Sequence, residues 1–274
     1  MQKSIYIAVC AMILAQASAA QQGEKIANDV RKYVEAKKIE GFENTKTTTS
    51  IEPKKTTSVE PRKSYSIGGQ EVDEANSAIF KAFRTHSEWQ KVVLIADCTA
   101  SMYPYIGQVV AWHQANMSQN LLLDVFLFND GNDNLKPQNT NKIDGKVGGI
   151  YTANPNNINN FLSVLAATID AGDGDDAPEN DLEAVLAAQA KQPQAKYFVL
   201  LADNSAIRDM SLLPQIKKPV HIILCNGGWV GDYVRVAYHT RGSITLLGDQ
   251  IDFSQPNKID KKNIMLGGMR YEIE

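Results

Sequence analysis

The sequence has little cysteine, no excess of basic residues and no long hydrophobic run beyond its amino terminus. Only Cys98 and Cys225 follow the first twenty residues, too few for a disulfide-stapled scaffold, so a packed core must stabilise the fold. The 28 Lys and Arg residues are outnumbered by 31 Asp and Glu residues, which argues against nucleic acid as a partner. No later segment is long and apolar enough to predict a membrane span.

The two remaining cysteines are both predicted at the carboxyl ends of sheet strands. A single bridge between Cys98 and Cys225 is one interpretation, and two buried free thiols are the other. We favour free thiols, because a disulfide requires two closely spaced α-carbons.

The first twenty residues have the pattern of a cleavable secretory signal. Lys3 precedes an apolar run over residues 5–15, and small residues follow at positions 17–20. Cys10 follows Val9, where a lipoprotein cleavage site would have a small residue, so no lipid anchor is predicted. We therefore expect an exported protein, either periplasmic or extracellular.

Two segments flank the predicted globular part. Residues 21–63 combine a short amphipathic helix with a Thr-, Pro- and Lys-rich linker, in which the octad TTSIEPKK is followed directly by TTSVEPRK. This composition cannot bury a core. Residues 251–274 form a C-terminal tail, in which Gly267 and Gly268 predict a small hairpin. We interpret the octad segment as a solvated spacer and assign the tail no function.

Residues 64–250 alternate between apolar strands and helical segments. Continuous apolar strands separated by helices indicate an α/β fold, here a three-layer Rossmann-like, mostly parallel six-stranded sheet with helices on both faces. The predicted strands lie at 91–96, 121–128, 148–152, 197–202, 220–225 and 243–247, and the predicted helices at 72–83, 103–120, 156–171, 181–191, 210–217 and 233–240. Sheets of this kind bind ligands beyond the carboxyl ends of their strands.

The first predicted strand of this sheet ends in the sequence DCTAS. Asp97, Thr99 and Ser101 place one carboxylate and two hydroxyl oxygens at alternate positions, so one turn can direct all three at a single point. Mg²⁺ or Mn²⁺ prefers about six such hard oxygens, and Ca²⁺ accepts them too, so neighbouring loops must supply further acids. Asp176, in the acidic loop GDGDDAPEND, and Asp203, directly after the fourth strand, are the candidates.

At these three loops the sequence resembles the von Willebrand factor A (vWA) family and its metal-ion-dependent adhesion site. DCTASM is similar to the family's Asp-x-Ser-x-Ser loop with Thr in place of the first Ser. GDDAPE resembles the Gly-Asp-x-Pro-Glu form of the second loop and gives Asp176 that role, and LLADNS gives Asp203 the role after the fourth strand. The resemblance covers residues 91–248 and leaves the signal, the linker and the tail unexplained.

The resemblance implies a divalent cation at the top of the sheet and a protein that binds rather than catalyses. In adhesive members of the family, an acidic side chain of the partner protein completes the metal coordination. Here an acid stands in the second loop, where Thr is usual, so three carboxylates would surround one dication. This excess of negative charge is expected to weaken the capture of an external carboxylate.

Other interpretations of the same residues stay open. Asp176 and Glu179 also form a plausible capping pair for the helix predicted at 181–191. A phosphohydrolase of the haloacid-dehalogenase type would likewise place a nucleophilic Asp after the first strand, but Thr99 stands where its acid/base Asp belongs, and a helix is predicted at 156–171 where it requires a strand. A third possibility is a metal-free scaffold.

The loop NDGNDN, residues 129–134, superficially resembles a calcium-binding loop. Leu135 occupies the position of the turn glycine, and no Glu closes the loop. We therefore expect it to form a rim beside the main site. His113 and His221 lie in a predicted helix and strand, where histidines usually pack rather than bind metal.

Overall fold

The computed structural model describes residues 28, 31, 32, 64–67, 70–135, 142–172, 174, 176, 178–228 and 230–273. The predicted signal peptide, nearly all of residues 21–63, and Asp173, Asp175 and Trp229 lie outside the described residues. Within the described part, none of the helices has the length and hydropathy needed to cross a bilayer.

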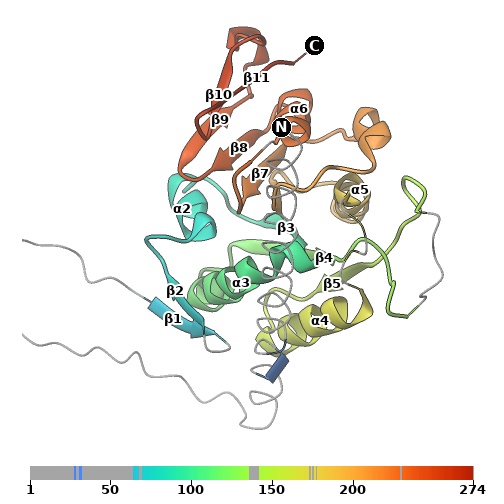
Figure 1. The fold of residues 1–274 in the computed structure, drawn as a ribbon. Coiled ribbons are helices and arrows are strands. Elements are labelled where there is room, and N and C mark those ends of the chain that lie inside the picture. The colour runs from blue at the N-terminus through green and yellow to red at the C-terminus, as the bar shows by residue number, and fades with distance from the viewer. Residues whose placement is uncertain are drawn as a thin grey trace, which may run out of the picture.

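A seven-stranded mixed sheet forms the middle of the molecule, in the order β5-β4-β3-β6-β7-β8-β9 (Figure 1). Its inner strands are parallel, and the two edge strands run antiparallel to their neighbours. The strands are β3 (Val92–Asp97), β4 (Leu122–Phe128), β5 (Ile150–Ala153), β6 (Phe198–Ala202), β7 (Val220–Leu224), β8 (Ser243–Leu246) and β9 (Asp249–Asp252).

The prediction of a mostly parallel sheet with interleaved helices is confirmed, but the predicted number of six strands is wrong. The additional strand, β9, has the sequence DQID and is largely exposed. A polar strand at the edge of a sheet leaves no apolar run in the sequence, so the pattern of buried strands could not reveal it.

Helices cover both faces of the sheet and create two separate cores. Along β3, Leu94 packs into one core and Ile95 into the other, as the two-residue period of a strand requires. The first core lies under α2 (Ala78–Thr85), α3 (Tyr103–Asn116) and α4 (Ile158–Ala171), and the second under α5 (Asp181–Lys191) and α6 (Gly231–Thr240). Short 3₁₀ turns span Ala100–Met102, Met117–Gln119, Met210–Gln215 and Pro256–Lys258.

The helix predicted at residues 72–83 is wrong in its first half. There the chain forms β2 (Gln70–Asp73), which pairs with β1 (Ser64–Ile67) as an antiparallel hairpin. Helix α2 begins only after Ser77, whose hydroxyl accepts a hydrogen bond from the Phe80 amide at 3.3 Å. A Ser at the N-cap position in this way fixes the start of a helix.

The C-terminal hairpin predicted around Gly267 and Gly268 is confirmed. Strands β10 (Ile264–Leu266) and β11 (Met269–Tyr271) pair antiparallel, and both glycines have positive φ angles, which favour Gly in a tight turn. Ile264, Leu266 and Tyr271 are buried in the second core. The tail is therefore packed against the sheet rather than appended to it.

Candidate functional site

The loop that follows β3 gathers three oxygen-bearing side chains. The Thr99 amide donates a hydrogen bond to Asp97 Oδ1 at 2.8 Å, which turns the chain sharply off the strand. The hydroxyl oxygens of Thr99 and Ser101 then lie 3.2 Å apart. Asp97 and Thr99 are buried, whereas Ser101 is exposed, so this first loop extends from a buried carboxylate to the protein surface.

Asp203 occupies the equivalent position on the neighbouring strand. It directly follows β6, which pairs in parallel with β3, and the register Ala96 to Leu201 brings both strand ends to one edge of the sheet. The Ser205 amide donates to Asp203 Oδ1 at 2.7 Å, which repeats the turn made at Asp97. Burial raises the pKa of Asp97 most, and the negative charge of Asp203 raises it further, against hydrogen bonds from Thr99 that lower it.

Asp176, the residue predicted to contribute from the second loop, lies in a different environment. Its Oδ1 atom is 2.8 Å from Lys142 Nζ and 2.8 Å from Arg208 Nη2, and 47% of its side chain is exposed. The structure thus brings Asp97, Thr99, Ser101 and Asp203 to one edge but pairs Asp176 with two cations. Its role as a metal ligand stays a prediction.

Glu179 and Asp181 lie close to Asp97 in place of Asp176. The Glu179 amide donates to the Ala206 carbonyl at 2.9 Å, and its own carbonyl accepts from the Arg208 amide at 2.8 Å, which ties the second loop to the chain beyond Asp203. Burial raises the pKa of Glu179, as do the charges of Asp97 and other nearby carboxylates. Burial and the charge of Asp97 also raise the pKa of Asp181, which is fully buried.

Gly174 allows the second loop to pack directly against the first. Its φ angle is +75°, and a Cβ atom built there would lie 3.0 Å from Thr99 Cγ2 and 3.3 Å from Glu179 Oε2. A side chain at this position would therefore separate the two loops.

The capping interpretation of Asp176 and Glu179 finds no support in the structure. The first turn of α5 is capped by Asp209 instead, whose carboxylate accepts from the Leu182 amide at 3.1 Å and from the Glu183 amide at 2.6 Å. A cap supplied by a residue beyond the end of the helix leaves no local sequence signal. The signal that could have identified Glu179 as a site residue is its place at the end of the GDDAPE motif.

Among the described residues, the site gathers buried carboxyl groups that have no ion-pair partner. Asp97 Oδ2, Glu179 Oε2 and Asp181 Oδ2 are all buried and have no hydrogen-bond partner within the described ranges. Buried carboxylates without partners either hold protons or bind a cation. Their oxygens, together with the Thr99 and Ser101 hydroxyls, are the ligand types that Mg²⁺ and Mn²⁺ select, so the residues present fit such an ion.

The carboxylates alone do not form a complete metal centre. In the part of the chain that the structure describes, no group of three or more His, Cys, Asp or Glu side chains is arranged to hold a metal ion. A cation bound here would therefore also need the hydroxyl oxygens of Thr99 and Ser101 and coordinated water.

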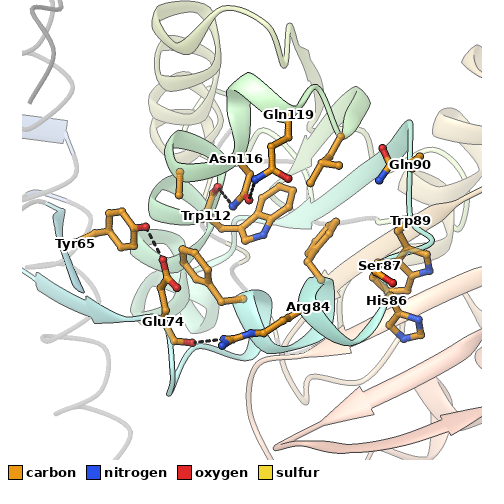
Figure 2. Close-up of a pocket in the computed structure, with 14 residues that line it drawn as sticks. Tyr65, Glu74, Arg84, His86, Ser87, Trp89, Gln90, Trp112, Asn116 and Gln119 are labelled. Atoms are coloured by element: carbon orange, nitrogen blue, oxygen red, sulfur yellow. Dashed lines mark hydrogen bonds between the residues drawn. The ribbon is translucent and has the colours of Figure 1, made fainter. Parts of the chain in front are cut away.

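A half-open pocket of about 410 Å³ lies elsewhere, between α2 and α3 (Figure 2). Its polar groups are largely paired with one another: the Tyr65 hydroxyl donates to Glu74, Arg84 donates to the Glu74 carbonyl, and Gln119 donates to Asn116. None of the predicted site residues lines this pocket, so we assign it no part in the function.

The sequence matches no protein-family model, and comparisons with curated proteins and with solved structures give no match. The resemblance to the vWA family therefore stays a prediction based on the three loops. The function is inferred below from the residues of the site.

Proposed function

We propose that this protein is an exported, vWA-like interaction module that binds one divalent cation and does not catalyse a reaction. The observation that carries the proposal is the buried Oδ2 atom of Asp97, which has no hydrogen-bond partner among the described residues. The same loop carries the paired Thr99 and Ser101 hydroxyls, and Asp203 lies at the next strand end. A dication would compensate the carboxylates and use the hydroxyl oxygens at the same time.

Asp97, Thr99, Ser101 and Asp203 would hold the ion, with Mg²⁺ or Mn²⁺ preferred and Ca²⁺ an alternative. Glu179 is the better placed acid of the second loop, because Asp176 is already paired with Lys142 and Arg208. A bound dication would supply an electrophilic centre that can accept an oxygen ligand from outside the chain.

The surroundings of the site suit a protein partner. Ser101 is exposed at the outer end of the first loop, so the site can be reached from solvent. A hollow of about 260 Å³ begins at Asn204 and Ser205, directly after Asp203, and extends to Asp232 and Tyr233 at the start of α6. We propose that an acidic side chain of the partner reaches the ion from this side. The predicted signal peptide supports a location in the periplasm or outside the cell.

The phosphohydrolase alternative is less well supported. Helix α4 directly precedes the acidic loop, where that class of enzyme requires a strand, and Thr99 stands in the acid/base position. A Thr hydroxyl cannot serve as a general acid or base near neutral pH in the way a carboxyl group can.

One experiment separates the three interpretations. Mg²⁺ and Mn²⁺ are titrated calorimetrically into the mature protein and into Asp97→Ala. The control is Asp260→Ala, which removes an exposed carboxylate in the C-terminal tail. Each protein is then assayed with p-nitrophenyl phosphate. Saturable binding that is lost in Asp97→Ala, kept in Asp260→Ala and accompanied by no turnover supports the proposal.

Two results would contradict it. Metal-dependent phosphate release that Asp97→Ala abolishes would identify a hydrolase. Absence of binding at about 10 mM of either ion would identify a metal-free scaffold.

A further inference from the structure

A compact group of opposite charges lies beside the proposed metal site. Lys142 Nζ is 2.5 Å from Asp130 Oδ2 and 2.8 Å from Asp176 Oδ1. Arg208 Nη2 is 2.8 Å from each of the same two oxygens and also donates to the Pro178 carbonyl. These groups come from two loops, β4–β5 and α4–α5, and from the chain after β6. The two cations share one pair of carboxylate oxygens.

Three of the four charged side chains in this group are largely withdrawn from water, and Asp176 is the exposed one. The side chain of Asp130 is fully buried, and those of Lys142 and Arg208 are only 8% and 14% exposed. Charged side chains are seldom buried to this extent unless each is paired with an opposite charge. The position between Asp130 and Asp176 is therefore one at which the fold requires positive charge.

Two further carboxylate oxygens at this position make no hydrogen bond to either cation. Asp130 Oδ1 and Asp133 Oδ2 are buried and have no hydrogen-bond partner among the described residues, and Asp133 Oδ2 lies 3.5 Å from Lys142 Nζ. Carboxylate and carbonyl oxygens in such surplus are the ligands of a hard divalent cation. Two single positive charges also equal the charge of one dication.

We propose that Lys142 and Arg208 fill a second cation position beside the metal site, which a divalent cation would occupy in their absence. The two side chains thereby limit the wild-type protein to one bound ion and keep Asp176 away from it. The statements about the single bound ion rest on the proposed function. The second cation position does not depend on whether the site at Asp97 binds metal.

The test counts bound Mn²⁺ ions per chain in the double variant Lys142→Met/Arg208→Met, which we call the clamp variant. Methionine keeps much of the apolar stem and removes the charge. The matched control is Lys191→Met/Arg235→Met, which removes two cations at more exposed positions. We expect the clamp variant to bind one more Mn²⁺ ion than the wild type and the control, and Asp130→Asn in the clamp variant to abolish that additional ion.

The same count in an Asp97→Ala background separates this proposal from the proposed function. In Asp97→Ala the first site is disabled, so this single variant is expected to bind no Mn²⁺. The triple variant that also carries Lys142→Met/Arg208→Met is expected to bind one ion. If the wild type binds none but the clamp variant binds one, the proposed function fails and this inference stands. A folded clamp variant that binds no more Mn²⁺ than its parent overturns the inference.

Loss of both cations leaves buried carboxylates uncompensated, so the variant can be unfolded without metal. In that case Mn²⁺ itself should restore the native circular-dichroism spectrum, because it replaces the missing charge. A clamp variant that stays unfolded at about 10 mM Mn²⁺ overturns the inference as well.

Discussion

Asp130 and Asp176 lie on different loops, yet each accepts hydrogen bonds from the same two cations, Lys142 and Arg208. Asp176 is therefore compensated by residues of the chain itself. Glu179, three positions further along the same loop, is buried, and its Oε2 atom has no such partner in the part of the chain that the structure describes. Asp176 and Glu179 of the GDDAPE motif thus lie in different electrostatic environments.

This difference predicts which acid of the second loop supports metal binding. Glu179→Gln should lower the affinity for Mg²⁺ about 10-fold or more, because it removes a carboxylate beside Asp97. Asp176→Asn should change it by less than about 3-fold, because that charge is already neutralised. Calorimetric titration of both variants checks the prediction, and a larger loss in Asp176→Asn would favour the ligand set expected from the sequence.

The close packing of the first two loops depends on Gly174. Gly174→Ala should lower the free energy of unfolding by about 2–3 kcal/mol, through both the left-handed backbone and the contacts with Thr99 and Glu179. Gly148→Ala is the matched control: its φ angle is +78°, but no atom lies within 4 Å of the added Cβ, so only about 1 kcal/mol should be lost. Urea denaturation measures both values, and equal losses would show that the loops are not in tight contact.

His221 in β7 predicts a pH dependence of stability. Burial, with a smaller effect from His86, lowers its pKa to about 4, so the folded protein keeps this imidazole neutral where the unfolded chain begins to protonate it below about 6.5. The contribution of His221 to the free energy of unfolding is therefore complete above pH 6.5. It amounts to about 1–3 kcal/mol and is lost as the pH falls from 6.5 through 4.

Urea denaturation between pH 4 and 7.5 tests this prediction. His221→Gln should flatten the decline on the acid side, whereas His239→Gln, at an exposed position, should leave it unchanged. An identical pH profile for the wild type and His221→Gln would contradict the assignment.

In a chain without residues 1–20, Cys98 and Cys225 should remain free thiols that react only after unfolding. Cys98 follows β3 and Cys225 follows β7, and β6 lies between these strands. Neighbouring strands are about 4.8 Å apart, so the two positions are separated by about 10 Å, beyond the roughly 7 Å that a disulfide allows between α-carbons. Ellman's reagent should find two thiols in denaturant and almost none without it, since burial also raises the pKa of both thiols. A denatured chain with no reactive thiol would show that they pair.

Much of the fold could be predicted from the sequence because its strands are buried on both faces. The segment YFVLLA contains β6, and residues 181–191 form α5 as expected. The hairpin of β1 and β2 and the edge strand β9 were missed, because short or polar strands leave no apolar run. Strands β1 and β2 pair with each other, and β9 pairs with β8, in each case across a short turn.

The site could be predicted only in part. Asp97, Thr99, Ser101 and Asp203 were accessible to sequence reasoning, because strand ends in a parallel sheet meet at one edge. The partners of Asp176 were not, since Lys142 and Arg208 lie in loops whose approach depends on the whole fold. The burial that distinguishes Glu179 from Asp176 is likewise a property of tertiary packing rather than of the motif.

The central claim is that a divalent cation binds between the ends of β3 and β6. The most direct test is the anomalous difference density of a crystal of residues 21–274 soaked in Mn²⁺. The account predicts one strong peak within coordination distance of the Asp97 carboxylate and the Ser101 hydroxyl, close to Asp203. A soaked crystal with no peak there, or with Mn²⁺ bound only at another place, would contradict it.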